Sequence, residues 1–325
     1  MPTTNRPKYC GILITDNCML RCKMCQMWES KRNPGELTAA EWKTTFSTLK
    51  GILDPQAEIC FTGGEPLLRK DILELIRFVS DSGLRTGLNT NAYCLDEETA
   101  KSIAASGLWS ITISLESLDE ERHDFIRGRQ GSQRRVMDAI ESLSRHCNGL
   151  YIGISTVICD TNIDDIIELA QWVQKSKRIN SIRFQALMQP LQTPEDENWH
   201  RDQRYNHLWP KDSDKAESVL RALIELKEKG GLEKLNNPVA QLRVFQAYFR
   251  NPRLLPSTRK CIFGHEVINI NHLGDISLCP ELASLGNVKD ADITGLWHSD
   301  RTERLQRQIK DCKKSCKFSV NCFWE

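Results

Sequence analysis

The chain has 325 residues, 40% of them hydrophobic, which is enough for one large domain or for one domain with an extension. Its 44 Lys and Arg residues balance 43 Asp and Glu residues, so charge gives no reason to expect nucleic acid or an acidic membrane surface as a partner. No run of eighteen apolar residues occurs and the start lacks a secretory signal, so we expect a cytoplasmic protein without a membrane span.

From about residue 9 to 188, short β-rich runs alternate with longer amphipathic stretches. This alternation predicts a parallel sheet with right-handed crossovers. Six strands are too few for an eight-stranded barrel, so we expect an α/β fold of the (β/α)6 partial TIM barrel type. The predicted strands are 9–15, 57–63, 84–91, 108–116, 150–158 and 181–188, and the predicted helices lie around 38–51, 70–82, 95–106, 133–147 and 163–177. Asp96 is the expected N-cap of the third helix.

The pattern changes after residue 188. A polar stretch with three prolines precedes a predicted helix at 213–229, and alternating residues flank "NHLG" in a predicted hairpin at 266–280. A last amphipathic helix is expected around 299–310. We therefore divide the chain into a barrel (1–188), an insertion or helical connection (189–258) and a cysteine-rich domain (259–325).

Thirteen cysteines is a high count for a chain of this length. In a reducing compartment they are not expected to form a disulfide framework. Eight of them fall into two groups, 18–25 and 261–322. The other five lie along apolar stretches, where we expect them to act as small hydrophobic residues. These five are Cys10, Cys60, Cys94, Cys147 and Cys159.

The first group, Cys18-x3-Cys22-x2-Cys25, follows the first predicted strand. Loops after the strands of a parallel α/β fold form its ligand-binding rim, and thiolates select soft metals or iron–sulfur clusters. A structural zinc site would need a fourth close ligand, and the next nine residues offer only Glu29. Three thiolates on a cubane cluster would leave one iron open, which is a catalytic arrangement.

A second signal, "FTGGEPLL", follows the second predicted strand. Gly63 and Gly64 allow a close approach of backbone to a ligand, and Glu65 adds a carboxylate. "GGEP" alone is equally compatible with an ordinary turn. Its position one strand after the three-cysteine loop favours a binding role.

These two motifs, in this order and on these strands, resemble those of radical S-adenosylmethionine (SAM) enzymes over about residues 9–188. The resemblance implies a [4Fe–4S] cluster held by Cys18, Cys22 and Cys25, with SAM on the open iron. It further implies that one electron cleaves SAM to methionine and a 5′-deoxyadenosyl radical, which abstracts hydrogen from a substrate.

The resemblance also suggests residues that bind SAM. Gly63, Gly64 and Glu65 would hold the methionyl amino group, and Met24 would lie near the adenine. Arg127 resembles the arginine that pairs with the SAM carboxylate, although it could be a solvated charge at a helix end. Ser114 is a candidate SAM contact, and Asn89 and Asn91 are candidate ribose contacts or turn residues.

The C-terminal cysteines resemble the SPASM and twitch extensions that hold auxiliary iron–sulfur clusters. The expected ligands of one auxiliary [4Fe–4S] cluster are four of the five cysteines in this region, which makes a twitch-type extension the better fit. The alternative is a zinc ribbon, for which His265, His272 and His298 lie nearby. The five cysteines are Cys261, Cys279, Cys312, Cys316 and Cys322.

The predicted reaction is hydrogen abstraction from a small molecule of the sugar, cyclitol or nucleoside type, with the auxiliary cluster aiding oxidation or substrate binding. No leader-binding domain is expected before the first strand, but the maturation of a ribosomally made peptide stays an alternative, and a non-catalytic redox protein is a third. We expect an electron donor such as flavodoxin or ferredoxin. The candidate substrate-side residues are Tyr93, Glu116, Arg183 and Gln185.

Overall fold

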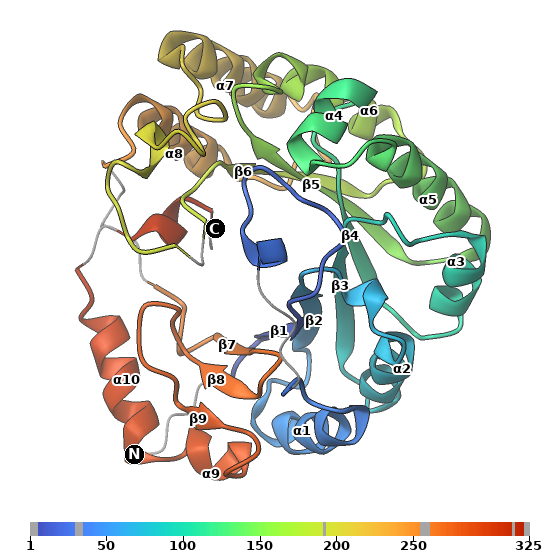
Figure 1. Ribbon diagram of the computed structural model, residues 1–325, viewed down its shortest axis with the longest axis vertical. Coiled ribbons are helices and arrows are strands. Elements are labelled where there is room, and N and C mark those ends of the chain that lie inside the picture. Colours follow the sequence, from blue (N-terminus) through green and yellow to red (C-terminus); the bar gives the residue numbers. More distant parts are fainter. Residues whose placement is uncertain (1–5, 30–34, 191–192, 254–260, 314–315, 322–325) are drawn as a thin grey trace.

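A computed structural model describes residues 6–29, 35–190, 193–253, 261–313 and 316–321. Six parallel strands form the barrel wall, in the order in which they follow one another along the chain (Figure 1). The strands are β1 (Tyr9–Thr15), β2 (Glu58–Gly63), β3 (Arg85–Thr90), β4 (Ser110–Ser114), β5 (Tyr151–Ile158) and β6 (Ser181–Ala186). All six match predicted strands, and the partial barrel is confirmed.

Helices cover the outer face of this curved wall (Figure 1). The predicted helices are present, and Asp96 caps α3 as expected because its Oδ1 accepts the Thr99 N–H at 2.8 Å. The short helix α4 was not predicted as a separate element. The helices of the barrel are α1 (Ala39–Ile52), α2 (Ile72–Asp81), α3 (Glu97–Ala104), α4 (Glu120–Arg127), α5 (Ser132–His146) and α6 (Ile166–Lys175).

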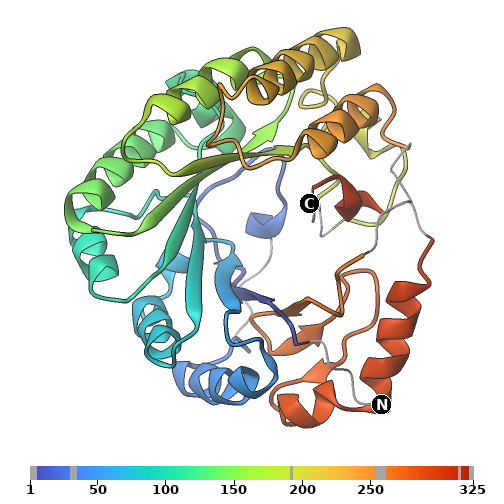
Figure 2. The ribbon, with the colours of Figure 1, turned by 180° about the vertical axis from the view of Figure 1, so that it is seen from behind.

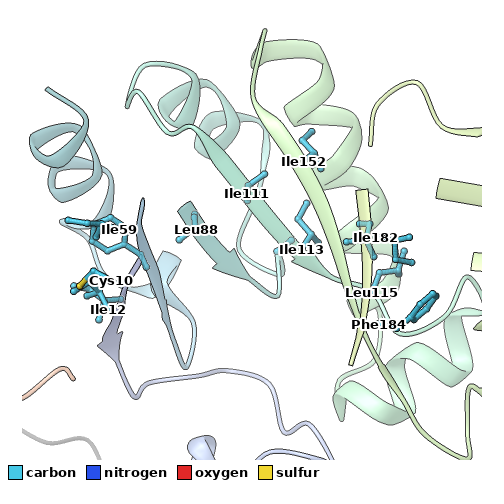
Figure 3. Packing of buried hydrophobic residues seen from close by; sticks show 14 of the residues in the cluster. Cys10, Ile12, Ile59, Leu88, Ile111, Ile113, Leu115, Ile152, Ile182 and Phe184 are labelled. Carbon is cyan, nitrogen blue, oxygen red and sulfur yellow. The ribbon is translucent and has the colours of Figure 1, made fainter. Parts of the chain in front are cut away.

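Side chains alternate between the two faces of the wall. One set packs against the helices in a continuous apolar core, part of which Figure 3 shows, including Ile12, Ile59 and Ile113. The opposite set faces the hollow of the barrel and is only half-buried. Its polar members are Thr62, Asn89, Thr112, Ser114, Ser155, Arg183 and Gln185.

The C-terminal part extends the same sheet. Strand β7 (Val267–Ile270) pairs in parallel with β1, and β8 (Asp275–Ser277) and β9 (Gly286–Asn287) follow in antiparallel order, so the sheet has nine strands. The predicted hairpin around "NHLG" is β7–β8. Helices α9 (Ile293–Trp297) and α10 (Asp300–Lys310) flank this hairpin, and the predicted terminal helix is confirmed (Figure 2).

The connection between the two parts is helical, with α7 (Ser213–Glu228) and α8 (Val239–Arg250) packed against each other. Trp199 and Trp209 from the polar stretch are buried, and Trp209 contacts the rings of Tyr248 and Phe249 at centroid distances of 5.3 and 5.5 Å. The stretch is therefore anchored by an aromatic cluster. Among the described residues, no helix is long and apolar enough to cross a bilayer.

Candidate functional site

Three thiols and the two glycines line one cavity at the carboxyl ends of the strands. Cys18, Cys22 and Cys25 share this cavity with Gly63 and Gly64. Asn89, Asn91, Ser114 and Arg127 line it as well. The structure thus brings together, from four strand ends, residues that lie more than one hundred positions apart in the chain.

The close contact between β1 and β2 explains the two glycines. A Cβ on Gly63 would lie 2.2 Å from Thr15 O, and Gly63 has a φ of +134°. A Cβ on Gly64 would lie 2.2 Å from Asn17 O. Both obstacles are backbone atoms next to the cysteine loop, so these glycines set the position of that loop.

We expect Gly64→Ala to lower the free energy of unfolding by about 1–3 kcal/mol and to weaken metal retention, because the added methyl must push the Cys18 loop away. Urea unfolding of the apoprotein and the iron content of the reconstituted protein measure the two effects. Gly295→Ala is the matched control, since an added Cβ there meets nothing within 4 Å. Equal behaviour of the two variants would contradict the prediction.

Each thiol of the loop accepts hydrogen bonds. Asn91 Nδ2 lies 3.7 Å from Cys18 Sγ, Arg127 Nη1 lies 3.4 Å from Cys22 Sγ, and Met27 N lies 3.4 Å from Cys25 Sγ. Burial raises the pKa of Cys18 to about 11 and also raises the pKa of Cys25. At neutral pH a metal cation would therefore be needed to hold these groups as thiolates, and N–H···S bonds are what stabilises thiolate ligands of iron–sulfur clusters.

Glu65 joins β2 to β3. Its carboxylate is completely buried and accepts hydrogen bonds from Thr90 Oγ1 (2.7 Å), Asn91 N (2.8 Å) and Leu67 N (3.1 Å). Burial raises the pKa of Glu65, and these donors partly offset that effect. Because these donors occupy both oxygens of Glu65, its side chain stabilises the turn at Gly63 and Gly64. The amino group of a ligand in the cavity would therefore contact the backbone of this turn.

Arg127, at the end of α4, is the buried cation of the cavity, with 11% of its side chain exposed. Its Nε lies 3.3 Å from Glu116 Oε1, but the N–H is not aligned for a hydrogen bond and has no partner. Burial lowers the pKa of Arg127, but Cys22 and Glu116 outweigh it and raise that pKa. A permanently charged guanidinium that lines the cavity is suited to a carboxylate ligand.

Glu116 faces Arg127 and not the barrel hollow. Its Oε2 accepts the Val157 N–H at 2.7 Å, and burial raises the pKa of its carboxyl group while Arg127 opposes the rise. Sequence reasoning missed two residues that hold this segment. Asn162 donates to Glu116 O at 2.8 Å, and His123 Nδ1 accepts the Glu116 N–H at 3.1 Å.

Burial, followed by the charge of Arg127, lowers the pKa of His123 to about 3. The unfolded chain, with an ordinary pKa of 6.5, binds this proton first, so stability falls as the pH drops from 6.5 towards 3. Between pH 7.5 and 5.5 we expect the wild type to lose about 1.3 kcal/mol more unfolding free energy than His123→Gln. Urea unfolding of both apoproteins tests this, and parallel pH profiles would contradict it.

The remaining candidates lie in different places. Met24 and Gln185 line a second cavity, together with Val157, Leu187 and Asn321, that shares Cys25 and Met27 with the first. Arg183 Nη2 donates to Asn321 O at 3.0 Å, so it contacts the C-terminal segment. Tyr93 lines neither cavity, and its hydroxyl accepts from Arg129 Nε at 3.1 Å.

The C-terminal thiols converge as well. Burial raises the pKa of Cys261, Cys279 and Cys316. The charge of at least one other thiol of this group also raises each of these pKa values, and Cys312 acts in this way on Cys261 and Cys279. Cys322 lies outside the described residues. Among the thiols that the structure describes, no three lie within 4.8 Å of one another.

One further group, Asp16, Glu36 and His272, joins the barrel to the β7–β8 turn. Their ligand atoms lie within 4.8 Å of one another, and His272 Nε2 is 3.6 Å from Asp16 Oδ2. Glu36 also accepts from Thr15 Oγ1 at 2.7 Å and lies 3.7 Å from Arg69. These contacts account for the group as a polar link between the two parts.

The cavity combines three thiols on one loop, a glycine turn packed against that loop and a buried arginine. This combination is typical of an iron–sulfur enzyme that binds a small charged cosubstrate. Residues 12–173 match the family model of the radical SAM superfamily, and residues 261–323 match that of SPASM, an iron–sulfur cluster-binding domain. The chain belongs to the radical SAM superfamily and carries a C-terminal SPASM domain. It is therefore an enzyme whose cofactors are a SAM-binding [4Fe–4S] cluster, an auxiliary cluster and SAM.

Named relatives differ in chemistry. An AdoMet-dependent heme synthase of Methanosarcina barkeri is 23% identical, covering 96% of this chain and 88% of the relative. A PqqA peptide cyclase of Bradyrhizobium diazoefficiens is 37% identical but covers only 49% of this chain and 41% of the relative. Among solved structures, SuiB of Streptococcus suis bound to S-adenosylmethionine superposes with a TM-score of 0.72 at 17% identity, over 96% of this chain and 73% of SuiB.

Proposed function

We propose that this chain uses SAM to abstract a hydrogen atom from a polar small molecule held in the barrel hollow. The observation that carries the proposal is the single cavity shared by Cys18, Cys22, Cys25, the Gly63–Gly64 turn and Arg127. When bound, the cluster and SAM supply a 5′-deoxyadenosyl radical. The protein's part is to hold SAM in one orientation and to keep the substrate next to it.

The chain offers a partner for each end of SAM. The turn at Gly63 and Gly64 would present backbone to the amino group, and the Arg127 guanidinium, which lines the same cavity, would pair with the carboxylate. The second cavity, with Met24, Val157 and Leu187, supplies the apolar surface that an adenine ring requires. Since the two cavities share Cys25 and Met27, we propose that SAM extends from the first cavity into the second.

The inward-facing side chains support the proposed class of substrate. Thr62, Thr112 and Ser155 offer hydroxyls, and Asn89 and Gln185 offer amides, all half-buried on the inner face of the wall. A site with several hydrogen-bonding groups favours a hydroxyl-rich or amide-bearing ligand, since an apolar one would leave these groups unpaired. This supports a sugar, cyclitol or nucleoside type of substrate.

The auxiliary thiols lie at the same mouth of the barrel. Asn321, five residues after Cys316, donates to Ala186 O and accepts from Ala186 N, both at 2.8 Å, and so fixes the C-terminal segment to the end of β6. Gln241 Nε2 adds a bond to Val320 O at 3.1 Å. We propose that this anchorage keeps the auxiliary cluster near the substrate, where it takes up an electron or binds the substrate.

All twelve cysteines that the structure describes are free, which supports a reducing, cytoplasmic location. We further propose that the electron for SAM cleavage comes from a flavodoxin or ferredoxin.

The test is anaerobic reconstitution, reduction with dithionite and incubation with SAM. We expect 5′-deoxyadenosine to form, and its rate to rise with candidate polar small molecules. A substrate deuterated at the reacting carbon should transfer deuterium to 5′-deoxyadenosine. The absence of any cleavage would refute the enzyme reaction, while stimulation by a peptide alone would replace the small molecule by a peptide substrate.

A further inference from the structure

Asn162, in the loop between β5 and α6, is a completely buried polar residue that lines neither cavity. Its Nδ2 donates to Glu116 O at 2.8 Å and to Val157 O at 3.0 Å, and its Oδ1 accepts the Cys159 N–H at 2.9 Å. Both hydrogens of the amide are therefore used. The opposite orientation of the amide would place Oδ1 against two carbonyl oxygens, so these three contacts fix the side chain.

The two carbonyl groups that Asn162 contacts belong to different ends of the SAM site. Glu116 is the ion-pair partner of Arg127, which lines the first cavity, and Arg127 Nε lies 3.3 Å from Glu116 Oε1. Val157 lines the second cavity, which supplies the surface for the adenine ring. The Val157 N–H also donates to Glu116 Oε2 at 2.7 Å. Glu116 and Val157 are thus joined twice, once directly and once through the Asn162 amide.

The loop that carries Asn162 also holds α4, the helix that ends at Arg127. Asp165 in this loop accepts from Ser117 Oγ at 2.5 Å and forms an ion pair with Arg122 in the first turn of α4. The Asp165 N–H in turn donates to Asn162 O at 2.9 Å. The position of Arg127 is therefore set through its helix as well as through its ion pair, and both routes lead to the same loop.

A second buried asparagine shows what a purely structural amide looks like in this fold. Asn237 is as completely buried as Asn162 and also makes three hydrogen bonds. Its Oδ1 accepts the Phe184 N–H at 2.7 Å, and its Nδ2 donates to Phe184 O at 2.8 Å and to Gln241 Oε1 at 2.9 Å. Asn237 thus satisfies both backbone groups of a single residue on β6, whereas Asn162 joins two segments that reach different cavities.

We propose that Asn162 is a positioning residue that sets the separation between the carboxylate end and the adenine end of the SAM site. This inference rests on the proposed function, in which one SAM molecule extends from the first cavity into the second. A ligand that spans two subsites gains affinity when their separation is fixed, whereas a ligand that fills one subsite does not. Asn162 therefore acts on intact SAM, and not on L-methionine or 5′-deoxyadenosine, each of which fills one subsite.

The test measures the affinities of the reconstituted holoenzyme for SAM, L-methionine and 5′-deoxyadenosine separately, by equilibrium dialysis. In Asn162→Ala the affinity for SAM should fall at least tenfold, while the affinities for methionine and 5′-deoxyadenosine should change less than about twofold. Asn237→Ala is the matched control, since it removes an equally buried amide with three hydrogen bonds. It should lower stability and leave all three affinities within about twofold of the wild type.

A purely structural role of Asn162 would weaken all three ligands by a similar factor or none of them, and either result would overturn the proposal. An equal loss of SAM affinity in Asn237→Ala would overturn it as well. A wild type that binds no SAM would instead refute the proposed function.

If Asn162→Ala does not retain iron, hydrogen exchange of the full-length apoprotein replaces the affinities. The Val157 N–H is bonded to Glu116 and not to Asn162, so its exchange reports the coupling between the two segments. It should exchange at least tenfold faster in Asn162→Ala than in the wild type or in Asn237→Ala. Equal exchange rates of this amide in the three proteins would contradict the positioning role.

Discussion

Replacing Cys18, Cys22 and Cys25 together by alanine is expected to abolish 5′-deoxyadenosine formation and to lower the iron content from about eight to about four per chain. These thiols lie in the loop fixed by the Gly63–Gly64 turn, and Asn91, Arg127 and Met27 direct N–H groups at them. Iron and sulfide analysis after anaerobic reconstitution measures the change.

The matched control replaces Cys10, Cys60 and Cys159, which are at most 4% exposed and pack in the barrel wall. Serine or alanine at these positions should cost stability but leave about eight irons bound. The C-terminal counterpart is Cys279→Ala, which should remove the other set of about four irons and leave SAM binding intact. Retention of zinc by the C-terminal thiols, with no second set of irons, would contradict the auxiliary cluster.

The second large effect is expected at the Arg127–Glu116 pair. Arg127→Met leaves Glu116 with 1% of its side chain exposed and without its cation, so the free energy of unfolding should fall by about 3–5 kcal/mol. Affinity for SAM should fall at least tenfold, because the cavity loses its charged donor. Equilibrium dialysis with SAM and urea unfolding report the two quantities separately.

A double variant separates the two roles of Arg127. Glu116→Gln removes the uncompensated charge while its amide oxygen can still accept the Val157 N–H. Arg127→Met/Glu116→Gln should therefore recover most of the stability but none of the SAM affinity. If Arg127→Met bound SAM as tightly as the wild type, the assignment of Arg127 to the SAM carboxylate would fail.

Local patterns were sufficient to predict most of the barrel. Alternation identified all six strands because each has one face against the helices, and Asp96 signalled its helix through a cap that depends on nearby residues alone. The group at 18–25 was visible because metal ligands on one loop have a characteristic spacing, whereas the group at 261–322 was identified by its resemblance to SPASM and twitch extensions. The α8 helix was not predicted, although its buried residues Leu242, Phe245 and Phe249 recur at helical spacing.

Contacts between distant segments could not be predicted from the sequence. Nothing local links Asn321 to Ala186, or Asn162 and His123 to Glu116, because these side chains act on backbone groups that only the folded barrel brings within reach. Tyr93 was chosen as a candidate for its position at the end of the third strand, and Arg183 as a polar residue on the sixth strand that shares a face with Gln185. The structure shows that Arg183 contacts the C-terminal segment and Tyr93 a surface arginine.

The pairing of β1 with β7 means that the sheet cannot be completed until late in synthesis. Strand β1 has β2 on one side, but its other edge stays unpaired until residues 267–270 have been made. Until then the unpaired backbone groups of this apolar strand lie directly beside the cysteine loop and can pair with another nascent chain. A shortened version ending after α8 should thus aggregate, although it retains every residue that lines the first cavity.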